Sequence, residues 1–235
     1  MSRRFTSRRR ISLSDTDTLG RLRLDAIARY LQDAATEDWL DAGFDLDTHV
    51  WVVRRTELEL REPFRPEDAV EVETWCSGVA GPAAARRYSL RGVHGGRVEA
   101  ETIWIHLDRS LRPKRLGDDF LRVYGASAGA RRAPTRFTLP PPPRADGAPW
   151  RFRVADVDRL GHVNNAAYWV PVEEAWRNGC VAVRLHRFHG VLEYRQPLDL
   201  DDDVRLVADD GTVWLVVDGE ARAAARYEAR PGLRL

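Results

Sequence analysis

Apolar and polar residues follow two different periods along this chain. In residues 24–35, apolar side chains recur at steps of three and four, which is the spacing of one face of an α-helix. Asp25 is a suitable N-cap for this helix, and Gly43 is a suitable residue just beyond its end. The pattern therefore predicts an amphipathic helix near the start of the chain.

A second helix is expected in the last third of the chain. Asn164 and Asn165 are both good N-cap residues, and the helix should run through Trp176 to Gly179. Pro171 lies inside this span and has no backbone N–H, so it predicts a kink or a late start of the helix.

Most of the remaining chain alternates between apolar and polar residues in the manner of β-strands. Hairpin turns are expected at residues 95–96, 209–211 and 218–219, where glycines occur. One helix followed by a meandering antiparallel sheet, twice over, is an α+β design in which each sheet wraps its helix. The expected strands are residues 9–13, 56–61, 70–75, 87–91 and 98–107 in the first half, and residues 151–155, 190–195, 204–208, 212–218 and 220–228 in the second.

One short segment occurs in both halves. Residues 155–163 read Ala-Asp-Val-Asp-Arg-Leu-Gly-His-Val, and residues 14–22 read Ser-Asp-Thr-Asp-Thr-Leu-Gly-Arg-Leu. The distance between the copies is too long for a solenoid repeat and matches a whole domain duplicated in tandem. Both copies have the aspartates, but only the later one has an imidazole, at His162, where the earlier one has Arg21. The later copy is followed by two carboxamides, Asn164 and Asn165, and the earlier one by Arg23-Leu24. We therefore expect an enzyme with one active copy.

Residues 124–149 separate the two copies and have the composition of a connector. They contain four consecutive prolines, residues 140–143, which favour an extended and semi-rigid segment. The chain is accordingly divided into a first domain (1–123), a connector (124–149) and a second domain (150–235).

The charge balance and the cysteines argue against several classes of protein. The 37 basic residues nearly offset the 36 acidic ones, so the composition does not suggest nucleic-acid binding. No apolar run approaches the ~20 residues of a membrane span. The basic residues 1–10 precede no apolar signal segment and are expected to be a solvated tail. Two cysteines without metal-ligand spacing fit a reducing cytoplasm.

The order of several motifs resembles the acyl-ACP thioesterase family, whose members carry two hotdog folds in one chain. The resemblance covers nearly the whole chain outside the connector. It implies that the first hotdog contributes much of an acyl pocket and the second the chemistry of fatty acyl-ACP hydrolysis, in fatty acid biosynthesis. It implies no cofactor and no metal. The segments that carry the resemblance are residues 51–55, 68–75, 86–87, 103–108, 112, 158–168 and 192–195.

The chain departs from the family's usual site pattern at two places. The family motif reads Asp-x-Asn-x-His, whereas Leu160 stands here where the asparagine is expected. Residues 196–198 replace an acidic residue and a cysteine that many relatives carry. Asp158 and His162 therefore carry over, but the third acidic member of the site does not. Glu193 is nearby in sequence but occupies a strand position, so it is not assigned that role.

The resemblance implies thioester hydrolysis, in which the leaving group needs little acid catalysis. A thiol has a pKa of about 8.5, so a thiolate departs readily near neutral pH. Asp158 is the candidate general base, or alternatively a nucleophile that forms a transient anhydride. His162 would orient water or bond the thioester carbonyl, and Asn164 would fix the water or Asp158. Backbone N–H groups near Asn165, at the helix start, would bind the developing oxyanion. Simpler interpretations are a helix cap for either asparagine and a solvated turn for the acidic residues 199–203.

The expected partner is acyl carrier protein, which is acidic and would need a basic docking patch. Arg86-Arg87 and Arg131-Arg132 are the candidates for this patch. Acyl-CoA is the alternative substrate, and a non-catalytic acyl-binding protein is the alternative from another class. We expect a monomer built as a pseudo-dimer, or a homodimer, in the cytoplasm, without nucleic-acid or membrane partners.

Overall fold

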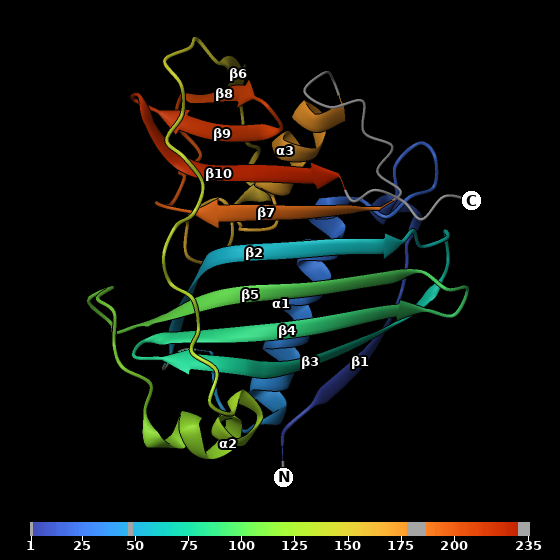
Figure 1. Ribbon diagram of the computed structural model, residues 1–235, viewed down its shortest axis with the longest axis vertical. Helices are drawn as coiled ribbons and strands as arrows, with labels where there is room; N and C mark the ends of the chain where they lie inside the picture. Colours follow the sequence, from blue (N-terminus) through green and yellow to red (C-terminus); the bar gives the residue numbers. More distant parts are fainter. Residues whose placement is uncertain (1, 47–48, 178–186, 230–235) are drawn as a thin grey trace.

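The computed structural model describes residues 2–46, 49–177 and 187–229, and the described strands form one antiparallel sheet shared by both halves (Figure 1). The strand order is β1-β3-β4-β5-β2-β7-β10-β9-β8-β6, so the second half repeats the order of the first in reverse across the β2–β7 contact. The first half contains β1 (Phe5–Arg10), β2 (Val50–Glu62), β3 (Ala69–Ala80), β4 (Ala83–Gly92) and β5 (Arg97–Leu107). The second half contains β6 (Ala148–Trp150), β7 (Phe188–Tyr194), β8 (Val204–Asp209), β9 (Thr212–Val217) and β10 (Glu220–Ala229).

The two halves are joined by backbone pairing and by a common core. β2 and β7 pair antiparallel from Arg55 opposite Glu193 to Leu60 opposite Phe188. One hydrophobic cluster contains Leu31 of the first half together with Trp169 of the second. The halves therefore form a single folding unit around the β2–β7 contact.

The predicted first helix is present as α1 (Leu24–Asp41), which lies against one face of the sheet (Figure 1). Its N-cap is Arg23 and not Asp25, so that part of the prediction was wrong. The reason is a contact with the other half, since the carboxylate of Glu173 accepts the Leu24 N–H at 2.9 Å. Gly43 follows the helix with φ +84, as a glycine beyond a helix end commonly does.

The second helix, α3, begins late. It spans Trp169–Ala175, and residues 165–168 before it form consecutive turns. Its predicted end at Gly179 lies outside the described residues. Pro171 is the third helical residue, where a backbone N–H has no partner within the helix, so proline is tolerated there. A late start was one of the two predicted effects of this proline. No described helix combines the length and the apolar character needed to cross a membrane.

The connector covers the face of the sheet opposite to α1, as Figure 1 shows. Trp214 on β9 donates its indole N–H to the Pro140 carbonyl at 2.9 Å, and all six residues of β9 are buried. Glu193 is fully buried and accepts the Thr138 and Leu139 backbone N–H groups at 2.6 and 3.2 Å. Glu193 therefore anchors the connector to β7.

Several local predictions were wrong. The outermost strands lie earlier than expected, at β1 and β6 instead of residues 9–13 and 151–155. The basic start is not a solvated tail, because β1 pairs with β3 and Arg3 lies 2.7 Å from the Asp38 carboxylate. The helix α2 (Asp118–Ala128) was not predicted and extends into the segment assigned as connector.

Candidate active site

The motif shared by the two halves forms the same turn twice. In the second half, the Asp158 N–H donates to the His162 carbonyl at 2.9 Å, and Gly161 takes φ +85. In the first half, the Asp17 N–H donates to the Arg21 carbonyl at 2.8 Å, and Gly20 takes φ +72. The duplication expected from sequence is thus reproduced in backbone geometry, and left-handed glycine makes the turn possible in each copy.

The Asp158 carboxylate has a structural part in this turn. Its Oδ1 accepts the Leu160 N–H at 2.8 Å, which is an Asx-type contact. Among the described residues, Oδ2 makes no hydrogen bond. Leu160, which stands at the family's asparagine position, is half exposed.

His162 has an acidic partner that the sequence did not predict. Its Nδ1 lies 2.6 Å from Oδ1 of Asp199, and both side chains are partly exposed. Leu198, the residue before this aspartate, accepts the Val163 N–H at 2.8 Å, which holds the two turns together. Asp199 belongs to the acidic run interpreted as a solvated turn, yet it lies two residues beyond Pro197, where the family's acidic residue was missing. That small displacement in sequence was the available signal.

The two asparagines have different environments. The Asn164 side chain accepts the Ala166 N–H at 2.9 Å, so Asn164 caps the turn that precedes α3. The Asn165 carbonyl accepts the Tyr194 hydroxyl at 3.0 Å, and burial raises the pKa of Tyr194 far above its usual range, so this hydroxyl stays protonated. Both contacts hold the peptide groups around Asn165 in place.

A cavity lies where the two halves meet, next to this turn. Asn165 lines it from the second half, opposite Gln32 on α1 and Trp104 on β5. The motif therefore reaches the cavity through Asn165, while Asp158 and His162 lie earlier in the turn and not in the cavity wall. The remaining lining residues are Ala28, Leu31, Val53, Thr56, Thr102, Ala166 and Tyr194.

The equivalent place in the first half is also a cavity, but an ion-pair network forms part of its wall. Glu173 corresponds to Gln32 in the duplicated halves, and Leu24 corresponds to Asn165. Here the Glu173 carboxylate accepts the Leu24 N–H, and Arg177 contacts both Glu173 and Asp17. The backbone N–H that would face a ligand is thus already bonded.

Burial and hydrogen bonds shift the pKa values of both carboxylates in this network. Burial raises the pKa of Glu173, despite the Leu24 N–H and Arg177. Burial also opposes ionisation of Asp17, but hydrogen bonds from the Arg21 backbone and from the Arg177 and Arg21 side chains lower its pKa to about 2. Arg21, which replaces the histidine in this copy, is therefore part of an ion pair within the turn.

Of the four arginines predicted to form a docking patch, three form ion pairs, and Arg132 is exposed with no ion pair to a described residue. Their role in docking stays a prediction. Arg86 is buried and lies 2.6 Å from the Asp38 carboxylate. Arg87 and Arg131 both pair with Glu101, at 3.1 and 2.7 Å. In the described parts of the chain, no group of three or more His, Cys, Asp or Glu side chains is arranged to hold a metal ion.

Comparison with known proteins gives the family. The N-terminal domain of acyl-ACP thioesterases matches residues 2–124, and the C-terminal domain of these enzymes matches residues 144–228. This chain belongs to the acyl-ACP thioesterase family. The uncharacterized proteins MT2057 and Rv2001 of Mycobacterium tuberculosis are each 32% identical to it over 229 residues, which are 94% of this chain and 90% of theirs. A chloroplastic oleoyl-acyl carrier protein thioesterase of Coriandrum sativum is 24% identical, over 88% of this chain and 64% of the plant protein.

Solved structures of this family have the same fold. An acyl-ACP thioesterase from Bacteroides thetaiotaomicron superposes with a TM-score of 0.81 at 19% identity, covering 96% of this chain and 98% of its own. A 12:0-ACP thioesterase from Umbellularia californica gives 0.78 at 20% identity, covering 97% and 98%. The predicted α+β fold of two tandem hotdogs is therefore confirmed, as is the resemblance on which it was based.

Proposed function

We propose that this thioesterase hydrolyses fatty acyl thioesters of acyl carrier protein, releasing a free fatty acid and holo-carrier. The observation that carries this proposal is the difference between the two copies of the turn. The Leu24 N–H is bonded to the Glu173 carboxylate, whereas the Asn165 N–H makes no hydrogen bond within the described residues and lies beside a cavity. The Asn165 N–H can therefore donate a hydrogen bond to the carbonyl oxygen of a ligand, whereas the Leu24 N–H is already engaged.

The Asn165 N–H would bind the thioester carbonyl oxygen and the oxyanion that develops from it. The Glu173 carboxylate supports this assignment, because the equivalent N–H in the first half, that of Leu24, donates to its anionic oxygen at 2.9 Å. Oxyanion donors that are already in position need no reorganisation during the reaction, which is why they accelerate it. Asn164 would keep this donor in place through its bond to the Ala166 N–H.

Asp158 would act as the general base or as the nucleophile, since it has an unengaged Oδ2 next to the turn. As a base, it takes a proton from water while the water oxygen bonds to the acyl carbon, and the tetrahedral intermediate then expels the pantetheine thiolate. The thiolate is a tolerable leaving group at neutral pH. His162, held by Asp199, would orient the water or the carbonyl.

A hydrolysis panel tests this proposal. Purified protein should release fatty acid from acyl-ACP with a higher kcat/KM than from the matched acyl-CoA, over a series of chain lengths. Faster turnover of the CoA esters would assign the carrier to coenzyme A and overturn the choice of acyl carrier protein. We likewise infer a cytoplasmic location from this choice of partner.

The second candidate is a non-catalytic acyl-binding protein. It is favoured by the position of Asp158 outside the cavity wall and by the departures at Leu160 and Pro197. Fluorescent acyl chains binding with micromolar affinity, with no hydrolysis above the uncatalysed rate for any carrier, would support it over the thioesterase.

A further inference from the structure

The segment that follows β5 carries an unusual density of positive charge. Four of the seven residues 109–115 are cationic, and each of the four is exposed and forms no ion pair with a described residue. We call residues 108–115 the basic hairpin. Its cations are Arg109, Arg112, Lys114 and Arg115.

Backbone hydrogen bonds hold the basic hairpin in a defined conformation. Leu107 and Pro113 form an antiparallel bridge, and the Lys114 N–H donates to the His106 carbonyl at 2.9 Å. The Asp108 carboxylate accepts the Ser110 and Arg112 backbone N–H groups at 2.8 and 3.0 Å, so this acidic side chain is used inside the turn. A held backbone presents its cations in a fixed arrangement, which lowers the entropy cost of binding a partner.

An apolar residue lies among these cations. Leu111 is 65% exposed at the tip of the basic hairpin. Protein interfaces combine an apolar centre with a polar rim, so one exposed leucine surrounded by arginines and a lysine is suited to contact with another protein. Asp118 and Asp119, at the start of α2, border this surface on one side.

The basic hairpin lies at the same end of the strands as the candidate site. Trp104 lines the cavity, and β5 continues from it to Leu107, which is about 10 Å of strand. Leu107 pairs with Val50 at the start of β2, and shortly before β2 the Leu46 carbonyl accepts a hydrogen bond of 2.6 Å from Arg159 of the motif turn. The ends of β5 and β7 also lie on the same side of the molecule in Figure 1.

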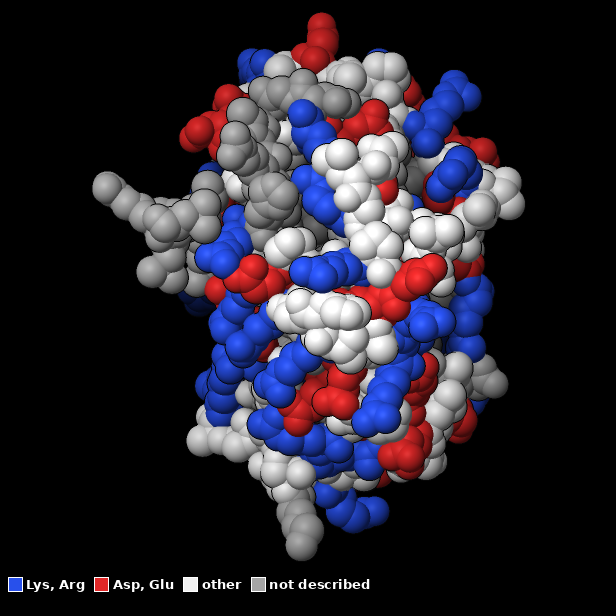
Figure 2. Space-filling model, turned by 90° about the vertical axis from the view of Figure 1, so that its right-hand side faces the viewer, with Lys and Arg blue, Asp and Glu red and all other residues white. Residues whose placement is uncertain are grey.

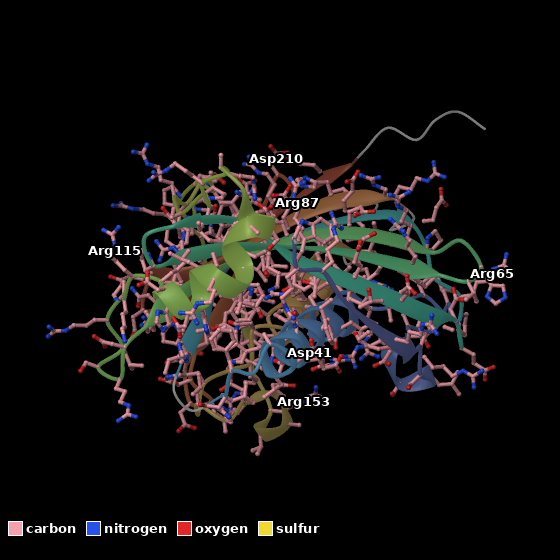
Figure 3. All side chains as sticks on the ribbon, turned by 90° about the horizontal axis from the view of Figure 1, so that it is seen from below. Asp41, Arg65, Arg87, Arg115, Arg153 and Asp210 are labelled. Carbon is pink, nitrogen blue, oxygen red and sulfur yellow. The ribbon has the colours of Figure 1, made fainter. Side chains whose placement is uncertain are left out.

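The opposite end of the molecule has a different charge pattern. Arg61 pairs with Glu59, Arg97 with Glu99 and Arg187 with Glu62. On the face of this end, Figure 2 shows basic and acidic side chains interspersed. Figure 3 places Arg115 and Arg65 at opposite ends of the molecule. Arg65 and Arg91 at this opposite end are also exposed without an ion pair to a described residue, so the distinguishing feature of the basic hairpin is that four such cations lie within seven residues.

We propose that the basic hairpin is the docking surface for an acidic acyl carrier protein. This inference rests on the proposed function. Carboxylates on the carrier face the four cations, Leu111 makes the apolar contact, and the pantetheine arm extends from the hairpin to the cavity beside Asn165. Complementary charge raises the rate at which two proteins meet, so it should matter for the substrate that is attached to the charged carrier.

The test compares two double variants on three thioesters of the same fatty acid, namely acyl-ACP, acyl-CoA and acyl-pantetheine. Arg112→Glu/Arg115→Glu reverses two charges on the basic hairpin. Arg65→Glu/Arg91→Glu is the matched control, because both residues are exposed and form no ion pair with a described residue. Arg65 lies at the opposite end in Figure 3, and Arg91 pairs in the sheet with Arg97 at the start of β5, the end of that strand away from the hairpin. The hairpin variant should raise KM for acyl-ACP roughly tenfold, because like charges now face the carrier, and leave acyl-pantetheine unchanged. The control should leave all three substrates unchanged.

Three outcomes would overturn the inference. An equal rise in KM for acyl-CoA means that the hairpin binds the nucleotide phosphates, and an equal loss with acyl-pantetheine means that the change acts on the chemistry or the fold. An unchanged KM for acyl-ACP means that the carrier docks elsewhere. Fluorescence anisotropy with labelled acyl-ACP measures docking without turnover. It therefore tests the docking role of the hairpin independently of the proposed hydrolysis. A failure of the proposed hydrolysis would be seen as absent turnover of acyl-pantetheine by the unmodified protein.

Discussion

At the scale of single residues, Gln32 and Glu173 occupy equivalent positions in the two halves and differ only in an amide against a carboxylate. Glu173 bonds the Leu24 N–H and recruits Arg177, so the backbone donor of the first copy is already engaged, although Leu24 also lines a cavity. Gln32 lines the cavity beside Asn165, where no described side chain takes the N–H. A neutral side chain at this position leaves room for the oxygen of a ligand.

Asp158→Asn tests the asymmetry between the two copies. The variant should lower kcat by about 10²- to 10⁴-fold with little change in Tm, because the carboxylate supplies general-base catalysis but its turn contact is retained by asparagine. Asp17→Asn should leave kcat near its normal value and lower stability by about 1–3 kcal/mol, because it weakens the contacts with Arg21 and Arg177. Steady-state kinetics and thermal unfolding of both variants decide the matter. Equal losses of activity would contradict a single-site enzyme.

Asp199→Asn tests the partner of His162. The substitution removes the carboxylate that holds the imidazole of His162. Because a catalytic side chain works best when a neighbouring group fixes its orientation, kcat should fall roughly tenfold while KM and Tm change little. Asp201→Asn is the control, because Asp201 is exposed in the same turn. If the two variants have the same kcat, Asp199 has no positioning role.

At the scale of elements, α1 and the connector are each held by a carboxylate from a segment that is distant in the sequence. The N-terminus of α1 is capped by Glu173 of α3, and Glu193 of β7 holds the connector against the sheet. α3 itself begins late because of Pro171, which leaves the turn around Asn165 outside the helix. The late start of α3 therefore leaves Asn165 in the turn on one side of the cavity, opposite residues from the middle of α1.

Glu173→Gln should alter how stability depends on pH. Burial raises the pKa of Glu173, so the unfolded chain releases this proton at a lower pH than the folded protein does. Its contribution to stability is complete below the unfolded pKa near 4.5 and is lost as the pH rises through the higher folded value. The unmodified protein should therefore lose free energy of unfolding relative to the glutamine variant as the pH rises from the unfolded pKa through the raised folded pKa, by about 1.4 kcal/mol for each unit of pKa difference.

Urea unfolding of the two proteins at several pH values measures this difference. Glutamine can still accept the Leu24 N–H, so the helix cap is kept in the variant. Parallel stability profiles would show that Glu173 does not ionise differently in the folded state.

At the scale of the whole molecule, the β2–β7 contact makes one sheet from two hotdogs. Six consecutive residue pairs join these strands, and the core is continuous between α1 and α3. Separating the halves would expose the long edge of β2 and the apolar residues beneath it. Such an edge is a template for pairing with other chains.

The protein should accordingly unfold in a single cooperative transition. Calorimetry should give a calorimetric enthalpy equal to the van't Hoff enthalpy, because neither half has a complete core. Residues 1–123 and 150–235 produced separately should lack cooperative unfolding and should aggregate. Two resolved transitions, or a stable isolated half, would contradict this description.

The sequence by itself determined the periodic elements and their duplication. The apolar spacing of residues 24–35 gave α1, and the glycines at the hairpin turns were sufficient to place them, since these signals depend on neighbouring residues. The copy of the Asp-x-Asp turn and the family resemblance together led to the correct fold. Catalytic roles for Asp158, His162, Asn164 and Asn165 remain predictions.

Only the tertiary structure decided which charges pair and which are left over. The Leu24 cap comes from a residue 149 positions away, Thr138 is bonded to Glu193 over 55 positions, and His162 meets Asp199 over 37. A carboxylate has no preferred partner in a sequence; it takes the donor that folding brings within hydrogen-bond distance. For this reason the ion pairs of Arg86, Arg87 and Arg131, and the exposed cations of the basic hairpin, became apparent only in three dimensions.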